Sequence, residues 1–467
     1  MGPMNNERDQ AIYDLVVEYE SNSKRGLEVF LSEKSYQQLI DYYEEEGQLD
    51  RALEVAGHAI HHHNYTIDFY LRKAHLLIDT HHEQDALETL DQAALFAPRE
   101  IEIDLLRAEA FIYMDRIDEA LALLEDRKIN VSKETLSDIL LVEAMAHEHQ
   151  EEYELMFYTL SRALRENHSN EEALERVWLA VELSKKYEES IKLHDYILDI
   201  DPYSYLSWYN LGHAHAYLGN YQEAVDAYEF AFVINERFEY AYRDCAELCF
   251  EMKRYRKALK CYQEILELFE PDSELLLRIG QCYREMGNYI DARKYFHRAI
   301  QLDPLNDEVH FHIGECYADE GKWKQAVRSF RKALSIENSR EEYYAALAEA
   351  FFHTNEWEKA SPLYRAAVDI APEDIRYWLR YIAFLLATEA YREALNCTEE
   401  AEDYELGVEI LYARIAVLFS MGRRKEAFYW LGEALAEDYD QHRVVFDLAP
   451  ELEQDSALLS MIASYRL

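Results

Sequence analysis

The histidines and cysteines are the residues in this chain best suited to metal chemistry. Residues 61–63 are three consecutive histidines, and His58 lies one helical turn before His62, a spacing that could bind a metal ion. Cys245 and Cys249 are also one turn apart and could supply half of a metal site. Neither group has a second pair of ligands at metal-site spacing. We therefore predict no metal site, with the histidines on a surface turn and the cysteines packed inside the fold.

Sequence motifs for catalysis are also missing. Acidic pairs such as Glu172 and Glu175 have a spacing suited to acid–base chemistry, but 92 acidic residues make such pairs common throughout the chain. The sequence has no glycine-rich phosphate-binding loop, no Gly-x-Ser-x-Gly motif and no protein kinase motif. We therefore expect no catalytic residues, no cofactor and no enzyme activity.

The chain is strongly acidic. Its 467 residues include 92 Asp and Glu against 48 Lys and Arg, which gives a formal net charge of -44. Such a surface repels the phosphates of nucleic acids and anionic lipid headgroups. No stretch is long and apolar enough to span a membrane, and the N-terminal residues show no secretory signal pattern. We therefore expect a cytoplasmic protein whose partners include neither nucleic acid nor a membrane.

The positions of the small residues show an internal repeat of 34 residues. Six alanines follow one another at this interval: Ala224, Ala258, Ala292, Ala326, Ala360 and Ala394. Each repeat contains two stretches with apolar residues at helical spacing, separated by a turn sequence such as Gly219-Asn220. One helical hairpin cannot bury its own apolar surface, whereas a stack of hairpins can. The sequence therefore predicts a stack of helical hairpins.

The repeat at residues 205–238 shows the pattern most completely. Its defining residues are Trp208, Leu211, Gly212, Gly219, Tyr221, Ala224, Tyr228 and Ala231. This pattern resembles the tetratricopeptide repeat (TPR), a unit of two short helices. The resemblance implies an all-α fold, a right-handed superhelical solenoid of about twelve helix-turn-helix repeats with terminal capping helices. The acidity and the tyrosine content are also similar to those of cytoplasmic TPR proteins of Bacteroidota.

The 34-residue period divides residues 33–442 into twelve repeats, with a two-residue insertion at Thr135 and Leu136. The predicted repeats span 33–66, 67–100, 101–134, 137–170, 171–204, 205–238, 239–272, 273–306, 307–340, 341–374, 375–408 and 409–442. Residues 1–32 are predicted to form an N-terminal helical cap and residues 443–467 a C-terminal capping helix, because their apolar residues could cover the ends of the stack.

The resemblance implies a binding groove lined by positions 2, 5, 9, 12 and 13 of each repeat. In the first ten repeats 21 acids occupy these positions against only three cations, Lys34, Arg243 and Arg284, with aromatic residues between them. The candidate binding residues are Glu109, Tyr113, Tyr209, Tyr217, Tyr240, Glu247, Phe250, Glu285, Glu308, Phe311, Glu315, Asp319, Glu349 and Phe352. Such a groove suits a basic protein segment, held by charge, stacking and cation–π contacts. A protein this acidic could also have acidic faces everywhere without a ligand, and that alternative stays open.

One known ligand of the family is not expected here. TPR adaptors of heat-shock chaperones bind an acidic C-terminal tail through a lysine at position 5 and an asparagine at position 9. No repeat of this chain has either residue at its place. An acidic groove should therefore reject such a tail.

The groove positions of the last two repeats contain no acid. The candidate apolar residues are Leu379, Leu386, Ile410, Val417 and Met421. An apolar groove of this size needs a cover, which the capping helix, a partner helix or a second copy of the chain could provide. Our first functional prediction is a non-catalytic protein-binding scaffold or adaptor. The alternative is a structural subunit of a stable complex or homo-oligomer that uses the apolar groove.

Overall fold

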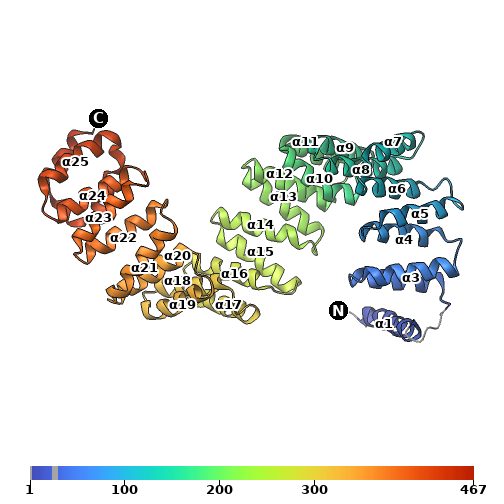
Figure 1. Cartoon of the computed structure of the whole chain (residues 1–467), viewed down its shortest axis with the longest axis horizontal. Helices are drawn as coiled ribbons and strands as arrows, with labels where there is room; N and C mark the ends of the chain where they lie inside the picture. Colours follow the sequence, from blue (N-terminus) through green and yellow to red (C-terminus); the bar gives the residue numbers. More distant parts are fainter. Residues whose placement is uncertain (1–2, 24–29, 467) are drawn as a thin grey trace. The chain divides into compact units, whose positions relative to one another are not determined.

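The computed structural model describes residues 3–23 and 30–466. Residues 24–29, which belong to the predicted N-terminal cap, lie outside the described residues, as do Met1, Gly2 and Leu467. All regular elements in the described ranges are helices, which confirms the predicted all-α class (Figure 1). Within these ranges, no helix combines the length and the apolar character that crossing a lipid bilayer requires.

The chain divides into two compact parts, the N-terminal half (Met1–Ala241) and the C-terminal half (Tyr242–Leu467). The N-terminal half contains α1 (Pro3–Ser23), α2 (Glu33–Glu45), α3 (Leu49–His62), α4 (Ile67–Asp79), α5 (Glu83–Ala94), α6 (Ile101–Tyr113), α7 (Ile117–Arg127), α8 (Lys133–His149), α9 (Tyr153–Glu166), α10 (Glu171–Ser184), α11 (Tyr187–Ile200), α12 (Tyr205–Tyr217), α13 (Tyr221–Ile234) and the start of α14 (Glu239–Glu251). In this half the two helices of a repeat pack against each other, for example α4 on α5 and α12 on α13.

The C-terminal half contains the rest of α14 and the helices that follow it. These are α15 (Tyr255–Leu268), α16 (Ser273–Glu285), α17 (Tyr289–Leu302), α18 (Asp307–Asp319), α19 (Trp323–Ile336), α20 (Glu341–His353), α21 (Trp357–Ile370), α22 (Ile375–Ala387), α23 (Tyr391–Glu402), α24 (Val408–Ser420), α25 (Arg424–Glu437), α26 (Arg443–Leu448) and α27 (Ser456–Ser464). Two short 3-10 helices, η1 (Tyr439–His442) and η2 (Pro450–Gln454), flank α26. Pairs such as α18 and α19 pack as hairpins here too, so the predicted stack of hairpins is confirmed.

The turn inside each hairpin contains a residue with a left-handed backbone. Gly219, with a φ of 77°, separates α12 from α13, as its position in the sequence predicts. Glycine adopts this conformation without strain because it has no Cβ. Lys185, with a φ of 58°, ends α10 in the same way, so the turn forms in repeats that lack the glycine as well.

Small residues allow the two helices of a hairpin to approach closely. The six alanines that mark the repeat are fully buried. A Cβ added at Gly212 would lie 2.6 Å from the ring of Tyr228, and one at Gly314 would lie 2.5 Å from the ring of Phe330. Tyr228 and Phe330 are themselves buried, so these rings fill the space that the missing side chains leave.

The helix bounds depart from a strict 34-residue period in two places. The predicted insertion at Thr135 and Leu136 lies inside α8, whose first turn begins at Lys133. Later, α24 begins at Val408, one residue before the predicted repeat start at 409, because α23 ends early at Glu402. Gly422 then supplies the left-handed residue one place earlier than the period predicts. Every position counted from 409 in the last repeat is therefore shifted by one residue.

The C-terminal segment does not form the single capping helix that the sequence predicts. Pro450 starts η2, since proline lacks the backbone N–H that would extend α26, and the segment therefore folds as short helices. Leu458 and Ile462 of α27 are buried in the same apolar cluster as Leu431 of α25. These short helices cover the end of the stack together.

Candidate binding sites on the first helices of the repeats

The histidines near the N-terminus connect helices and are not grouped as a metal site. The hydroxyl of Tyr19 on α1 lies 2.7 Å from Nδ1 of His58, and the hydroxyl of Tyr36 on α2 lies 2.6 Å from Nδ1 of His62. His58 and His62 are half-buried, so the prediction of a surface turn is wrong for them. Within the described ranges, no three His, Cys, Asp or Glu residues are grouped so that they could hold a metal ion.

The cysteines are packed inside the fold, as predicted. All six are buried as free thiols. The Sγ atoms of Cys245 and Cys261 lie 3.9 Å apart. Burial raises the pKa of the Cys282 thiol to about 12, so this thiol stays protonated at neutral pH.

A row of acids follows the first helices of the N-terminal half. Asp68, Glu102, Asp138 and Glu172, here called the acidic row, lie near the starts of α4, α6, α8 and α10. These four helices contact one another in that order. Reduced solvation raises the pKa of Glu102, and the negative charges of Glu100, Asp68 and Asp138 raise it further. The carboxylates of the acidic row are therefore close enough to repel one another.

Glu109, a predicted binding residue, lies two turns after Glu102 on α6. It is half-buried. Burial raises the pKa of Glu109 to about 7; His75 and Arg176 lower it, whereas Glu172 and Asp79 raise it. Among the described residues, no cation forms an ion pair with Glu102 or Glu109. Glu102 and Glu109 thus have no ion-pair partner among the described residues, although Arg176 acts on Glu109 at longer range.

Three of the four tyrosines predicted for the N-terminal half are exposed. Tyr113 is 48% exposed, Tyr217 53% and Tyr240 67%. Tyr209 is half-buried, and its ring contacts that of Phe238 with centroids 4.8 Å apart. The hydroxyl of Tyr217 donates a hydrogen bond to Glu182 at 2.5 Å, and this bond raises the pKa of Tyr217 to about 12.

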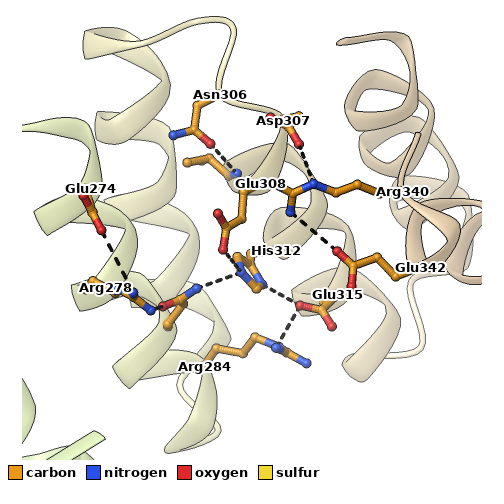
Figure 2. A network of polar contacts seen from close by, with 12 residues as sticks. Glu274, Arg278, Arg284, Asn306, Asp307, Glu308, His312, Glu315, Arg340 and Glu342 are labelled. Carbon is orange, nitrogen blue, oxygen red and sulfur yellow. Dashed lines mark hydrogen bonds and ion pairs between the residues drawn. The ribbon is translucent and has the colours of Figure 1, made fainter. Parts of the chain in front are cut away.

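The predicted acids of the C-terminal half are engaged with cations (Figure 2). Arg284 lies 2.8 Å from Glu315 and 3.2 Å from Asp319. His312 lies 2.6 Å from Glu315 and 3.6 Å from Glu308. The hydrogen bond with His312 holds the pKa of Glu308 below its ordinary value, although burial acts in the opposite direction. Burial alone would lower the pKa of His312, but its bonds to these two glutamates raise it.

The remaining predicted acids of this half also have partners. Glu247 accepts a hydrogen bond from the hydroxyl of Tyr262 at 2.6 Å and lies 3.1 Å from Nε of Arg278. Glu285 lies 3.7 Å from Nη1 of Arg284. Glu349 lies 3.6 Å from Nε2 of His353, an ion pair only when that histidine is protonated.

The predicted phenylalanines of the C-terminal half pack within the protein. The ring of Phe311 stacks on that of Tyr343 at 4.7 Å, and Phe352 contacts Phe384 at 5.7 Å. Phe250 contacts Tyr255 at 5.2 Å. All three are half-buried, so they present less ring surface to a ligand than the exposed tyrosines do.

A pocket of about 460 Å³ lies on the first helices of the C-terminal half. It contains Glu341, Glu342 and Glu349 of α20 together with Arg376 and Arg380 of α22. Positive and negative side chains therefore both line this pocket, whereas an acidic surface was predicted from the sequence.

Several of the cations that pair with these acids were not predicted, because they occupy positions of the repeat outside the five groove positions. Arg278, His312 and Arg380 occupy position 6 of their repeats, next to the counted position 5. Arg340 ends its repeat and lies 3.7 Å from Asp307 and 3.6 Å from Glu342. The recurrence of cations at position 6 was the available signal.

Family models identify the repeat. TPR models match residues 203–271, 246–304, 283–350 and 317–380. The chain is a tetratricopeptide repeat protein. TPR repeats generally mediate protein–protein interactions or serve as scaffolds, and all of the matching models are TPR models. A comparison with curated proteins found no match.

Solved structures of other TPR-type chains are similar to this one. YrrB, described as a TPR protein with an unusual peptide-binding site, is 17% identical with a TM-score of 0.33, over 39% of this chain and 95% of its own. A chain of the APC/C hetero-tetramer Cut9–Hcn1 is 12% identical with a TM-score of 0.37, and the match covers 87% of this chain and 97% of that one. MamA from Desulfovibrio magneticus RS-1, from residue 41 to its end, is 20% identical with a TM-score of 0.33, over 36% and 94%.

The apolar groove predicted for the last two TPR repeats is not open. Leu386, Ile410 and Val417 are buried in one cluster, against which Leu379, Met421 and Leu448 are packed. Leu448 belongs to α26, which contacts both α22 and α24. The one-residue shift at α24 also moves Ile410 and Val417 from the predicted groove into the core. The chain's own C-terminal segment therefore covers these apolar residues.

Proposed function

We propose that this TPR protein is a non-catalytic scaffold whose N-terminal half binds a basic segment of another protein. The observation that supports this most strongly is the pair Glu102 and Glu109, whose carboxylates have raised pKa values and no ion-pair partner in the described chain. A lysine or arginine from a partner would replace repulsion between carboxylates by attraction. The same charge would repel acidic chaperone tails, nucleic acid and anionic membranes.

The exposed tyrosines support a basic ligand as well. Tyr113, Tyr217 and Tyr240 are exposed on the first helices of the same half, and one face of Tyr217 stacks on Tyr187. A cation can bind such a face through cation–π attraction in addition to its ion pairs. The aliphatic part of a lysine side chain can pack against the same rings. Rings and carboxylates on one surface therefore suit lysine and arginine better than they suit neutral polar residues.

The predicted acids of the C-terminal half are less suited to this role. Glu308, Glu315 and Asp319 already bind Arg284 or His312. A basic ligand would have to displace these internal partners. We therefore propose that the acids of this half mainly stabilise the stack. We do not propose the alternative of a structural subunit that uses an apolar groove, because α26 covers the residues on which it depended.

A binding measurement with a matched control tests the proposal. The probe is a short fluorescein-labelled peptide made of lysine, glycine and serine, followed by fluorescence anisotropy. The double variant Glu102→Gln/Glu109→Gln should weaken binding about tenfold, and added salt should weaken the parent protein's binding steeply. The control Glu285→Gln/Glu349→Gln removes the same charge from the C-terminal half and should have little effect. Equal weakening by both variants would show a general effect of net charge and would contradict the proposal.

A further inference from the structure

We propose that the basic segment also carries a large apolar side chain, which enters a pocket between α6, α8, α9 and α10. The pocket has a volume of about 410 Å³ and lies within the N-terminal half. This inference rests on the proposed function, since it describes the same ligand on the same surface. It adds that charge alone does not select the ligand.

The lining of this pocket combines a buried apolar base with an exposed apolar rim. Ile112 is buried and Met145 is half-buried. Around them, Tyr113 is 48% exposed, Leu179 39% and Leu183 47%. Single exposed apolar residues are common on proteins, but these three side chains line one concavity. Its volume falls in the range of ligand pockets, large enough to accept a side chain such as leucine, methionine or phenylalanine.

Charged residues at the same place select a basic ligand. Glu148, Glu151 and Arg176 line the pocket. Arg176 lies 3.4 Å from Glu148 and 3.1 Å from Glu172, so its charge is already shared between two carboxylates. Glu109 lies one turn before Tyr113 on α6. Two carboxylates are paired with this guanidinium, and Glu109 and Glu151 add negative charge beside the apolar pocket.

The electrostatic environment of Tyr113 shows that the pocket and the acids form one surface. Burial raises the pKa of Tyr113, and the charges of Glu109, Asp79 and Glu148 raise it further, whereas Arg176 lowers it. The side chain of Tyr113 therefore interacts electrostatically with acids on α4, α6 and α8. A ligand side chain in the pocket would bring the neighbouring residues of its segment close to these carboxylates, where lysine or arginine is favoured.

Charge complementarity also excludes the other occupants of such a pocket. A second copy of the chain carries a formal net charge of -44 and would be repelled. An anionic lipid surface would be repelled for the same reason. A basic, apolar-anchored segment of another protein remains, in which an apolar residue has lysine or arginine on both sides.

Two peptides of equal charge separate the pocket from the charge. Both are short fluorescein-labelled peptides rich in lysine, one containing leucine at regular positions and the other serine at the same positions. The parent protein should bind the leucine peptide at least about tenfold more tightly than the serine peptide, because only the leucine peptide can fill the pocket. This comparison needs no variant and is made with the full chain.

Matched leucine variants then locate the effect. Leu179→Ser/Leu183→Ser should remove the preference for the leucine peptide while leaving binding of the serine peptide unchanged. Leu155→Ser is the control, since Leu155 on α9 is 47% exposed, as Leu183 is, but does not line the pocket. The control should keep the preference. Circular dichroism should show unchanged helicity for all three proteins, because the substituted side chains are on the surface.

The outcomes distinguish this inference from the proposed function. Equal affinity for both peptides, weakened by Glu102→Gln/Glu109→Gln, would overturn the apolar pocket and leave charge capture in place. Tight binding of the leucine peptide that is insensitive to these acids would support the pocket and overturn charge capture. Loss of preference in the Leu155→Ser control would overturn the assignment to this pocket, and no binding of either peptide would overturn both.

Discussion

Two acids of α6 in the N-terminal half and the acids around Arg284 in the C-terminal half have opposite environments. In the N-terminal half, Glu102 and Glu109 have raised pKa values because they are desolvated among other acids without an ion pair in the described chain. In the C-terminal half, Glu308 has a lowered pKa and Glu315 lies between His312 and Arg284. One repeat architecture therefore supports both acids that lack an ion-pair partner and acids that are paired.

Position 6 of the repeat helps to explain why the acids of α6 lack a partner. Position 6 is Arg278 on α16 and His312 on α18, and both side chains bind acids of the same or the preceding repeat. In the N-terminal half, position 6 is Arg72 on α4 and Arg176 on α10, which are likewise paired with acids. On α6 and α8, however, the same position is Leu106 and Val142, which are buried and carry no charge. Acidity at the groove positions does not by itself identify a binding site, because cations at other positions of the repeat, position 6 among them, determine whether the acids are already paired.

The largest effect should come from removing the central cation of the C-terminal half. Arg284→Leu leaves Glu285, Glu315 and Asp319 close together without their guanidinium. We expect the free energy of unfolding to fall by about 1–3 kcal/mol, less than for a fully buried pair because these side chains are partly solvated. Urea denaturation followed by circular dichroism measures this. Arg376→Leu, which removes an exposed arginine of α22, is the control and should change stability little.

The Arg284→Leu variant should also make the two halves more alike. It removes the arginine partner of Glu285, Glu315 and Asp319 in the C-terminal half, so the lysine peptide should gain a second binding site. Isothermal titration calorimetry would detect the change in stoichiometry. An unchanged stoichiometry together with unchanged stability would show that pairing by Arg284 does not distinguish the halves.

Glu109→Gln should stabilise the protein at high pH. The pKa of Glu109 is about 7 in the folded protein, against a reference value of 4.5. Between pH 4.5 and 7 the folded state therefore binds more protons than the unfolded state, and the free energy of unfolding falls as the pH rises through this range. Glutamine cannot ionise. We expect the variant to be more stable than the parent at pH 8, by about 1–2 kcal/mol, and equally stable at pH 4. Thermal melts at both pH values measure this, and a gain of equal size at pH 4 would contradict it.

Binding of the lysine peptide to the N-terminal half should depend on pH. Glu109 is mostly protonated at pH 6 and mostly ionised at pH 8, whereas lysine stays charged at both. The affinity should therefore rise by up to about tenfold between these values. Fluorescence anisotropy at constant ionic strength measures this, and Glu109→Gln should flatten the profile. The same steep profile in that variant would assign the titration to another group.

Glu308→Gln should have the smallest effect, of opposite sign to Glu109→Gln. The pKa of Glu308 is lowered in the folded state, so its ionised form contributes stability above its reference value of 4.5, and this contribution is lost as pH falls through the folded pKa. We expect the variant to lose about 0.5 kcal/mol at pH 7, since the carboxylate is partly exposed. The parent and the variant should be equally stable at pH 3 in thermal melts. A gain in stability at pH 7 would remove the contrast between the halves.

Much of the fold could be predicted from the sequence because its signals are local. Gly219 predicts the turn between α12 and α13, and the alanines at 34-residue intervals predict the buried helix contacts. The last repeat was placed one residue late, because the early end of α23 at Glu402 has no marker of its own in the sequence. This shift contributed to the prediction of an apolar groove around Ile410 and Val417.

The candidate site was predicted less well, because its chemistry depends on neighbouring repeats. The sequence gives the residue types at the groove positions, and Tyr113, Tyr217 and Tyr240 are exposed as a binding role requires. Whether a given acid has an ion-pair partner could not be predicted from the sequence. Arg284 and Glu315, for example, belong to different repeats and meet only when α16 and α18 stack.

The sequence by itself determined the repeat, the helical hairpins and the excess of negative charge. The spacing of small and aromatic residues specifies which helix faces are buried, and this requires only local geometry. The tertiary structure alone decided which acids are neutralised and that α26 covers the apolar end of the stack. Ion pairing and burial depend on distances between side chains that are far apart along the chain, and stacking of the helices sets those distances.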